Sequence, residues 1–128
     1  MIKLLFPILF LGAVACDRGS TAAAPEVTQP TLAVLPAGMI RVTDASQVCM
    51  VNDQFMGRAQ IPVDVEGRTY FGCCAMCKDK LTQQPGIRTA RDPVTGENVD
   101  KATAVIVQDA SGKVMYFTSE DTLRRYRG

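Results

Sequence analysis

The sequence contains no histidine and no tryptophan among its 128 residues. Without histidine there can be no Ser-His-Asp set for acyl transfer, and no imidazole to act as a general acid, a general base or a metal ligand. No glycine-rich loop of the phosphate-binding type is present either. These absences predict that the chain has no catalytic residues, and we expect no enzymatic activity.

The sequence also has almost no net charge, since 14 Lys and Arg residues are balanced by 13 Asp and Glu residues. A balanced surface gives no electrostatic reason to bind nucleic acid, so we expect no nucleic-acid partner. With 128 residues, 47% of them hydrophobic, the chain has enough material for one small domain or for two very small units that share a core.

The first fifteen residues are typical of an export signal. Lys3 precedes an apolar run over residues 4 to 14, which is too short to span a membrane, and Ala13-Val14-Ala15 stand directly before Cys16. Small residues before a cysteine resemble a bacterial lipobox, which implies that Cys16 is lipidated and that the protein is anchored to a membrane, facing the periplasm or the cell exterior. Ordinary signal-peptidase cleavage, which would release a soluble protein, is the alternative. Residues 16 to 38, rich in alanine and proline, are predicted to form a flexible tether.

A strand, a second strand and a helix are predicted around the cysteines. Apolar and polar residues alternate over residues 61 to 65, and Glu66-Gly67 then turns the chain into residues 68 to 71, a pattern typical of a hairpin. In the next segment Cys73 and Cys77 are four residues apart, which places both on one face of a predicted helix.

A second copy of this pattern, without cysteines, follows forty-six residues later. The shift places Tyr70-Phe71 on Tyr116-Phe117, and the intervening hairpin pattern recurs. The cysteines then have counterparts without sulfur: Cys49 aligns with Thr95, Cys73 with Ser119, and Cys77 with Leu123. We therefore predict an α+β fold of two tandem strand-strand-helix units packed as one small domain, with the cysteines in residues 39 to 87 and none in residues 88 to 128.

The spacing of Cys49, Cys73 and Cys77 is similar to that of the TRASH and YHS family of small metal-binding modules. Residues 92 to 99, Asp-Pro-Val-Thr-Gly-Glu-Asn-Val, resemble the Asp-Pro-Val-Cys-Gly-Met-x-Val opening of YHS modules, and residues 116 to 119 resemble their Tyr-Phe-Cys-Ser ending. A pair of such units on a lipoprotein is similar to the NosL copper-lipoprotein family. The resemblance implies treble-clef-like units and a role in copper delivery.

Thiolate chemistry supports metal binding independently of that resemblance. A cysteine at a helix N-terminus has a lowered pKa, and Cys73 is predicted to lie there, with Cys77 one turn further on the same face. A hairpin can bring Cys49 over both, so these three are the predicted ligands, with Cys74 and Met50 as auxiliaries. On a helix Cys74 would project about 100° away from Cys73, which argues against both binding one ion. The register that uses Cys74 with Cys77 stays open.

Ligand softness favours copper(I), because three thiolates with thioethers nearby suit an ion that accepts two or three sulfurs. Zinc is the alternative, and a structural zinc site would need a fourth ligand such as Cys74 or the carboxylate of Asp53. The expected function is capture, sensing or delivery of a soft metal at the cell envelope. The expected partners are the metal, the membrane and a protein that receives the metal.

Three other interpretations remain open. A disulfide from Cys49 to the helix would stabilise a small exported domain by about 3 kcal/mol. Cys74 and Cys77 form a Cys-x-x-Cys pair that could serve thiol redox chemistry. A purely structural or partner-binding module would use the arginines near the end of the chain against an acidic partner.

Overall fold

Short antiparallel strands make up most of the fold, which is known from a computed structural model that describes residues 35–128. The strands are Ile40–Val42 (β1), Val48–Cys49 (β2), Gln54–Phe55 (β3), Ile61–Val65 (β4), Arg68–Gly72 (β5), Thr89–Arg91 (β6), Asn98–Asp100 (β7), Val105–Gln108 (β8) and Val114–Phe117 (β9). The helices are Ala75–Gln83 (α1) and Glu120–Arg125 (α2), and short 3₁₀ turns span Ala45–Gln47 and Pro85–Arg88. The predicted α+β class is confirmed.

The predicted signal peptide, Cys16 and most of the tether lie outside the described residues. Within residues 35–128, no helix is long and apolar enough to cross a membrane.

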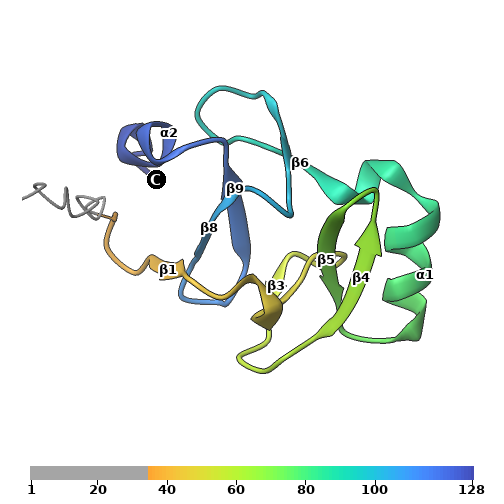
Figure 1. Ribbon diagram of the computed structural model, residues 1–128. Coiled ribbons are helices and arrows are strands. Elements are labelled where there is room, and N and C mark those ends of the chain that lie inside the picture. Colours follow the sequence, from red (N-terminus) through yellow and green to blue (C-terminus); the bar gives the residue numbers. More distant parts are fainter. Residues whose placement is uncertain (1–34) are drawn as a thin grey trace, which may run out of the picture. The chain divides into compact units, whose positions relative to one another are not determined.

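The predicted hairpin over residues 61 to 71 is confirmed. Strands β4 and β5 pair antiparallel, with Ile61 opposite Gly72 and Val65 opposite Arg68. Glu66 and Gly67 make the two-residue turn with φ values of 53° and 77°, as a tight hairpin turn requires. Helix α1 follows directly and packs against both strands (Figure 1).

The start of α1 differs from the prediction. The helix begins at Ala75, and Cys74 is its N-cap with an extended backbone, φ −155° and ψ 171°. Strand β5 continues to Gly72, so Cys73 and Cys74 are both used in turning the chain from strand to helix. Neither residue lies in the helix, and the helical angle that separated Cys74 from Cys73 in the prediction does not apply.

The C-terminal half repeats this local order. Strands β8 and β9 pair antiparallel, and α2 follows with Ser119 as its N-cap at φ −159° and ψ 169°. These angles match those of Cys74, so the structure pairs Ser119 with Cys74 and not with Cys73. At this point the equivalent residues are forty-five positions apart, one fewer than the predicted shift of forty-six.

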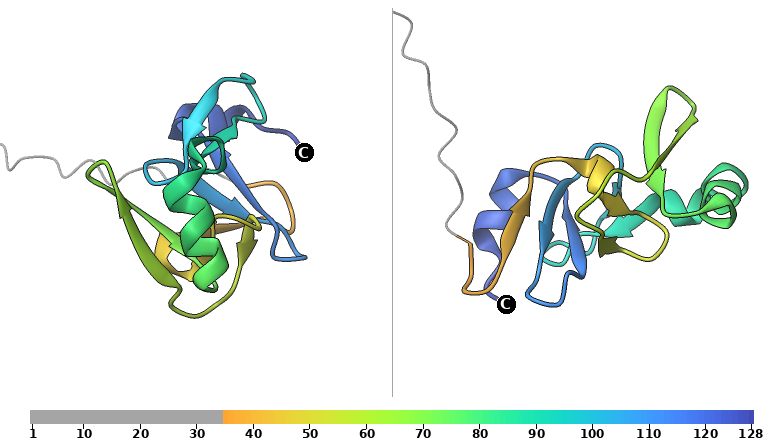
Figure 2. Two further views of the ribbon diagram at one scale, coloured as in Figure 1. Left: turned by 90° about the vertical axis from the view of Figure 1, so that its right-hand side faces the viewer. Right: turned by 90° about the horizontal axis from the view of Figure 1, so that it is seen from below.

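The two halves share strands and hydrogen bonds. Strand β1 pairs with β8, giving a three-stranded sheet in the order β1-β8-β9, although β1 precedes the cysteines in the chain. The turn between β2 and β3 also contacts the other half, since Val114 N–H donates to the Asp53 carbonyl at 2.9 Å and Phe55 N–H donates to the Gly112 carbonyl at 2.7 Å. Figure 2 shows α1 and α2 at opposite ends of this shared arrangement.

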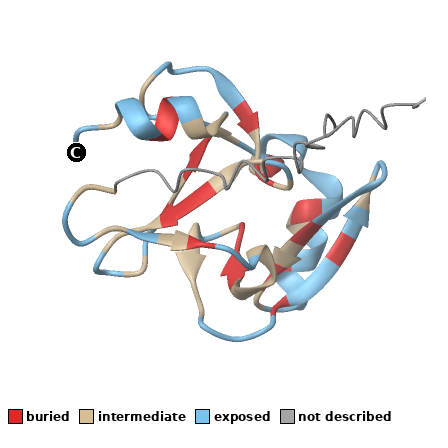
Figure 3. Ribbon diagram, turned by 60° about the vertical axis from the view of Figure 1, so that its left-hand side comes forward, coloured by how far each residue is buried: buried red, intermediate tan, exposed pale blue. Residues whose placement is uncertain are grey.

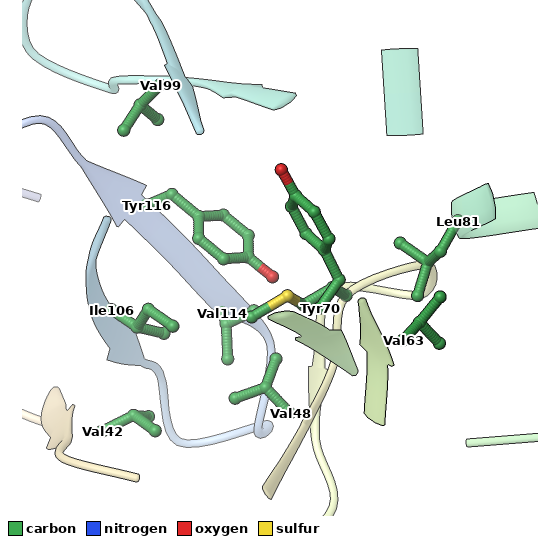
Figure 4. Close-up of a cluster of buried hydrophobic side chains, with 10 residues drawn as sticks. Val42, Val48, Val63, Tyr70, Leu81, Val99, Ile106, Val114 and Tyr116 are labelled. Atoms are coloured by element: carbon green, nitrogen blue, oxygen red, sulfur yellow. The ribbon is translucent and has the colours of Figure 1, made fainter. Parts of the chain in front are cut away.

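One apolar cluster joins both halves. It combines buried side chains from β1, β2, β4, β5 and α1 with others from β7, β8 and β9 (Figures 3 and 4). Its buried members are Val42, Val48, Met50, Val63, Tyr70, Leu81, Val99, Ile106, Val114 and Tyr116. A smaller cluster of Val107, Phe117 and Leu123 lies under α2. Because Cys49 lies between core residues Val48 and Met50 in the sequence, its position is fixed by the packing of the core.

Candidate metal centre

Three cysteines, from a strand, a strand-to-helix link and a helix, converge in the structure. Cys49 ends β2, Cys73 follows β5, and Cys77 lies in the first turn of α1. Their Sγ atoms all lie within 4.8 Å of one another, with 4.0 Å between Cys49 and Cys77 and 3.6 Å between Cys73 and Cys77. The structure therefore brings together the three residues that the sequence singled out as ligands.

These sulfur separations match the size of a metal–thiolate centre. Sulfurs at about 2.3 Å from a central ion stand about 3.8 Å apart in a tetrahedral arrangement and about 4.0 Å apart in a trigonal one. Two of the three separations, 3.6 Å and 4.0 Å, lie close to these values, and the third, between Cys49 and Cys73, is within 4.8 Å. The three sulfurs are therefore spaced on the scale of a metal–thiolate centre.

Cys74 lies beside this group at the surface. Its Sγ atom is 3.3 Å from that of Cys77, although Cys74 does not belong to the set of three mutually close sulfurs. Cys49 is fully buried and Cys77 nearly so, Cys73 is half-buried and Cys74 is exposed. All four are free thiols.

Gly72 makes the close approach of β5 and α1 possible. A Cβ atom at Gly72 would lie 2.8 Å from the Cys77 Cβ and 3.3 Å from the Cys77 carbonyl carbon. Sequence reasoning did not identify this residue. A glycine inside a strand often marks a close backbone approach, which was the available signal.

Backbone amides surround the Cys49 sulfur. Burial by itself would raise the pKa of Cys49, but the N–H groups of Asn52, Val51 and Cys73 face the sulfur and outweigh this effect, so the pKa lies below its ordinary value. A side-chain amide, Asn52 Nδ2, also lies 3.7 Å from Cys73 Sγ. These donors favour the thiolate form that a metal requires.

Of the other three thiols, Cys77 and Cys73 have raised pKa values and Cys74 has a lowered pKa. Burial, together with hydrogen bonding to Cys74 and Cys73, raises the pKa of Cys77 to about 12. Hydrogen bonding to Cys49 raises the pKa of Cys73. The N–H of Cys77 lowers the pKa of Cys74, although the sulfur of Cys74 makes no full capping hydrogen bond. Metal binding would displace protons from the thiols with raised pKa values.

Lys101 stabilises the turn that follows Cys49. Its ammonium group is buried, donates to the Met50 carbonyl at 2.7 Å and to Asp53 Oδ1 at 2.6 Å, and lies 5.2 Å from the centre of the Tyr116 ring. Lys101 comes from the cysteine-free half, and no sequence pattern pointed to it. Asp53, considered as a fourth zinc ligand, is engaged in this ion pair.

Met50, predicted as an auxiliary ligand, is fully buried and belongs to the shared apolar cluster. This packing explains why the side chain at position 50 is apolar, independently of any role in metal binding. The other methionine near the site, Met76, lies in the first turn of α1 and is 66% exposed.

The cysteine-free half has an oxygen cluster at the corresponding place. Asp92 is 1% exposed, and its carboxylate accepts hydrogen bonds from the N–H groups of Val94 at 2.8 Å, Thr95 at 3.3 Å and Thr118 at 2.8 Å. The Thr118 hydroxyl also donates to it at 2.9 Å. Burial opposes ionisation, but these hydrogen bonds and that of Thr122 hold the pKa of Asp92 well below its usual range.

The donors around Asp92 correspond to those around Cys49. In each case the N–H groups two and three residues further along the chain face the acceptor, and a third N–H comes from the second residue before the following α-helix. Asp92 therefore occupies the position of Cys49, and Thr118 that of Cys73. The sequence alignment had placed Thr95 opposite Cys49.

Comparison of the chain with protein-family models, with curated proteins and with solved structures gives no match.

Proposed function

We propose that the protein binds one soft metal ion, copper(I) in preference to zinc, through Cys49, Cys73 and Cys77. The observation that carries this proposal is the convergence of three thiols within 4.8 Å, one from β2 and two from the link between β5 and α1 and the start of that helix. Two of the three are buried, and the turn that carries the first is stabilised by a buried lysine. Sulfur-only coordination by three groups suits copper(I).

Zinc is the second candidate because a fourth sulfur is near. Cys74 lies 3.3 Å from Cys77, and a shift of its side chain would complete a four-sulfur site of the structural zinc type. Competition between the two metals distinguishes the candidates. Cys74 would be indispensable for zinc and dispensable for three-coordinate copper(I).

We further infer that the two halves are related treble-clef-like units of the TRASH and YHS type, one with cysteines and one without. Matching N-cap angles at Cys74 and Ser119 support this relation, as do the matching donors around Cys49 and Asp92. Together with the lipobox-like segment at Cys16, this relation favours an envelope-anchored protein for metal capture or delivery and not an enzyme.

The test is an anaerobic titration of copper(I) into the full chain against a competing chromophoric chelator. A Cys16→Ser background removes the one thiol that precedes the described residues. The wild-type site should take up one equivalent, and Cys49→Ser, Cys73→Ser and Cys77→Ser should each lower the affinity by about a hundredfold or more.

Thr118→Ser is the matched control. Thr118 lies in the oxygen cluster around Asp92, at the position that corresponds to Cys73 in the sulfur cluster. The substitution should leave the copper(I) affinity unchanged. If Cys49→Ser bound copper(I) as tightly as the unchanged chain, the proposed site would be wrong. Alkylation before reduction supplies an independent check, because a disulfide-stapled protein would leave two or more of these cysteines unmodified.

A further inference from the structure

Sulfur-bearing side chains become progressively more exposed from the interior of the site to the surface. Cys49 is 0% and Cys77 is 6% exposed, Cys73 is half-buried, and Cys74 and Met76 are exposed, the latter by 66%. An ion held by the first three would be shielded from solvent on its inner side. The exposed thiol beside it is Cys74, 3.3 Å from Cys77.

The sulfur of Cys74 contributes little as a helix cap, although the Cys77 N–H faces it. At the corresponding N-cap position Ser119 accepts a hydrogen bond from the Thr122 N–H at 3.2 Å, forming a capping box. Cys74 forms no such capping hydrogen bond, and as an exposed residue it contributes no core packing. A serine would serve α1 better as a cap, so the local fold does not explain why sulfur stands here.

Cys74 is nevertheless in direct contact with the metal centre. Its Sγ atom lies 3.3 Å from Cys77 Sγ, closer than either Cys73 or Cys49 approaches the same atom. It lies outside the set of three mutually close sulfurs, so in this arrangement it is not a fourth equal ligand. An ion that moved toward Cys74 would keep Cys77 as a shared ligand while it left the deepest sulfur, Cys49.

We propose that Cys74 is the transfer ligand of this site, the exposed thiolate through which copper(I) leaves the Cys49, Cys73 and Cys77 cluster for a thiolate- or thioether-bearing acceptor. This inference rests on the proposed metal binding. The exposed thioether of Met76, two residues further along in the first turn of α1, adds a second soft group at the surface close to Cys74 in the chain.

The step is a ligand exchange without oxidation or reduction. The bond from copper(I) to Cys49 breaks and a bond to Cys74 forms, and copper remains in the +1 state. A Cys74 thiol releases its proton to water as it binds, and the freed Cys49 thiolate can take up a proton. An acceptor sulfur then binds, and the bonds to the protein sulfurs break in turn.

The test separates the rate of transfer from the strength of binding. The copper(I)-loaded full chain in the Cys16→Ser background is mixed with excess bathocuproine disulfonate, whose aromatic nitrogens stand in for the soft donors of the acceptor. Formation of the coloured complex is followed by stopped flow. Cys74→Ser should leave the equilibrium affinity within about threefold of the parent and slow transfer by about tenfold or more. Because serine is the N-cap of α2, this substitution is compatible with the helix start.

Two further variants complete the design. Ala75→Ser changes an exposed neighbour in the same turn without altering sulfur, and it should transfer at the parent rate. Met76→Leu keeps the apolar volume and removes the thioether, and it should slow transfer less than Cys74→Ser does.

The outcomes are distinguishable. An unchanged transfer rate in Cys74→Ser, with normal affinity, would overturn the inference and leave the proposed function intact. A loss of affinity in Cys74→Ser equal to that in Cys73→Ser would also overturn it, because Cys74 would then be a permanent ligand. Failure of the parent protein to bind copper(I) at all would overturn the proposed function and the inference together.

Discussion

Gly72 and Cys77 pack so closely that a Cβ atom at Gly72 would lie 2.8 Å from the Cys77 Cβ. The end of β5 and the first turn of α1 can therefore meet only with glycine at this point. This approach sets the separation between Cys77 and Cys73, the residue that follows Gly72.

Gly72→Ala should disturb the site and the fold together. The added methyl group would force α1 away from β5, which should lower the free energy of unfolding by about 1–3 kcal/mol and the copper(I) affinity by about tenfold or more. Denaturant unfolding and the chelator competition measure the two effects. Gly86→Ala is the control, because a Cβ atom at Gly86 would have no neighbour within 4 Å; an equal effect of both substitutions would argue against a specific clash.

Much of the site follows from the sequence, because its chemistry depends on rare residues. Cys49, Cys73 and Cys77 are three of the four cysteines in residues 35–128, and the alternating pattern before Cys73 predicts the β4–β5 hairpin correctly.

The remainder depends on contacts that no local pattern encodes. The helix starts two residues later than predicted because β5 extends to Gly72, and this moves Cys74 into contact with Cys77. The contribution of Lys101 arises from a contact across fifty-one residues of sequence. The sequence alignment of the two halves is wrong by one residue at Ser119. It aligns Tyr116 with Tyr70, whereas the structure aligns the N-caps of the two helices.

Lys101→Met should loosen the turn that carries Cys49. The substitution keeps most of the buried volume but removes the ammonium that bonds the Met50 carbonyl and Asp53. We expect a loss of about 2 kcal/mol in the free energy of unfolding and a lower copper(I) affinity. Lys113→Met, at an exposed position, is the control and should change neither quantity measurably. Unchanged affinity in Lys101→Met would show that the turn is positioned without this lysine.

Asp92 should make stability depend on pH in the acid range. Its pKa in the folded protein lies well below that of the unfolded chain, so its stabilising effect is complete above about pH 4 and is lost as the pH falls toward the folded-state pKa. Asp92→Asn should therefore lower the free energy of unfolding by about 2 kcal/mol at pH 7. The difference from wild type should shrink below about pH 4.

Denaturant unfolding between pH 2.5 and pH 7 measures this dependence. Asp121→Asn is the control, since Asp121 is exposed on α2 and pairs with the exposed Arg124 and Arg125. It should change the free energy of unfolding by less than about 0.5 kcal/mol throughout. A constant difference between Asp92→Asn and wild type across this range would contradict the proposed role of the Asp92 carboxylate.

The correspondence between the two halves predicts that a second metal site can be built. Asp92, Thr118 and Thr122 stand at the positions of Cys49, Cys73 and Cys77, with matching backbone donors around the first of each set. The triple substitution Asp92→Cys, Thr118→Cys and Thr122→Cys should raise the copper(I) stoichiometry from one to two equivalents per chain. Titration under anaerobic conditions measures the change.

The control for this design uses the alignment that the structure overturns. Thr95→Cys, Ser119→Cys and Leu123→Cys place the same number of thiols at the positions given by the shift of forty-six residues. Leu123 is 1% exposed and packs under α2 beside Phe117, so its sulfur would face the smaller core cluster and not the turn at Asp92. This triple variant should stay at one equivalent. If both triple variants bound a second ion equally well, thiol content and not position would govern binding, and the correspondence of Asp92 with Cys49 would have no functional meaning.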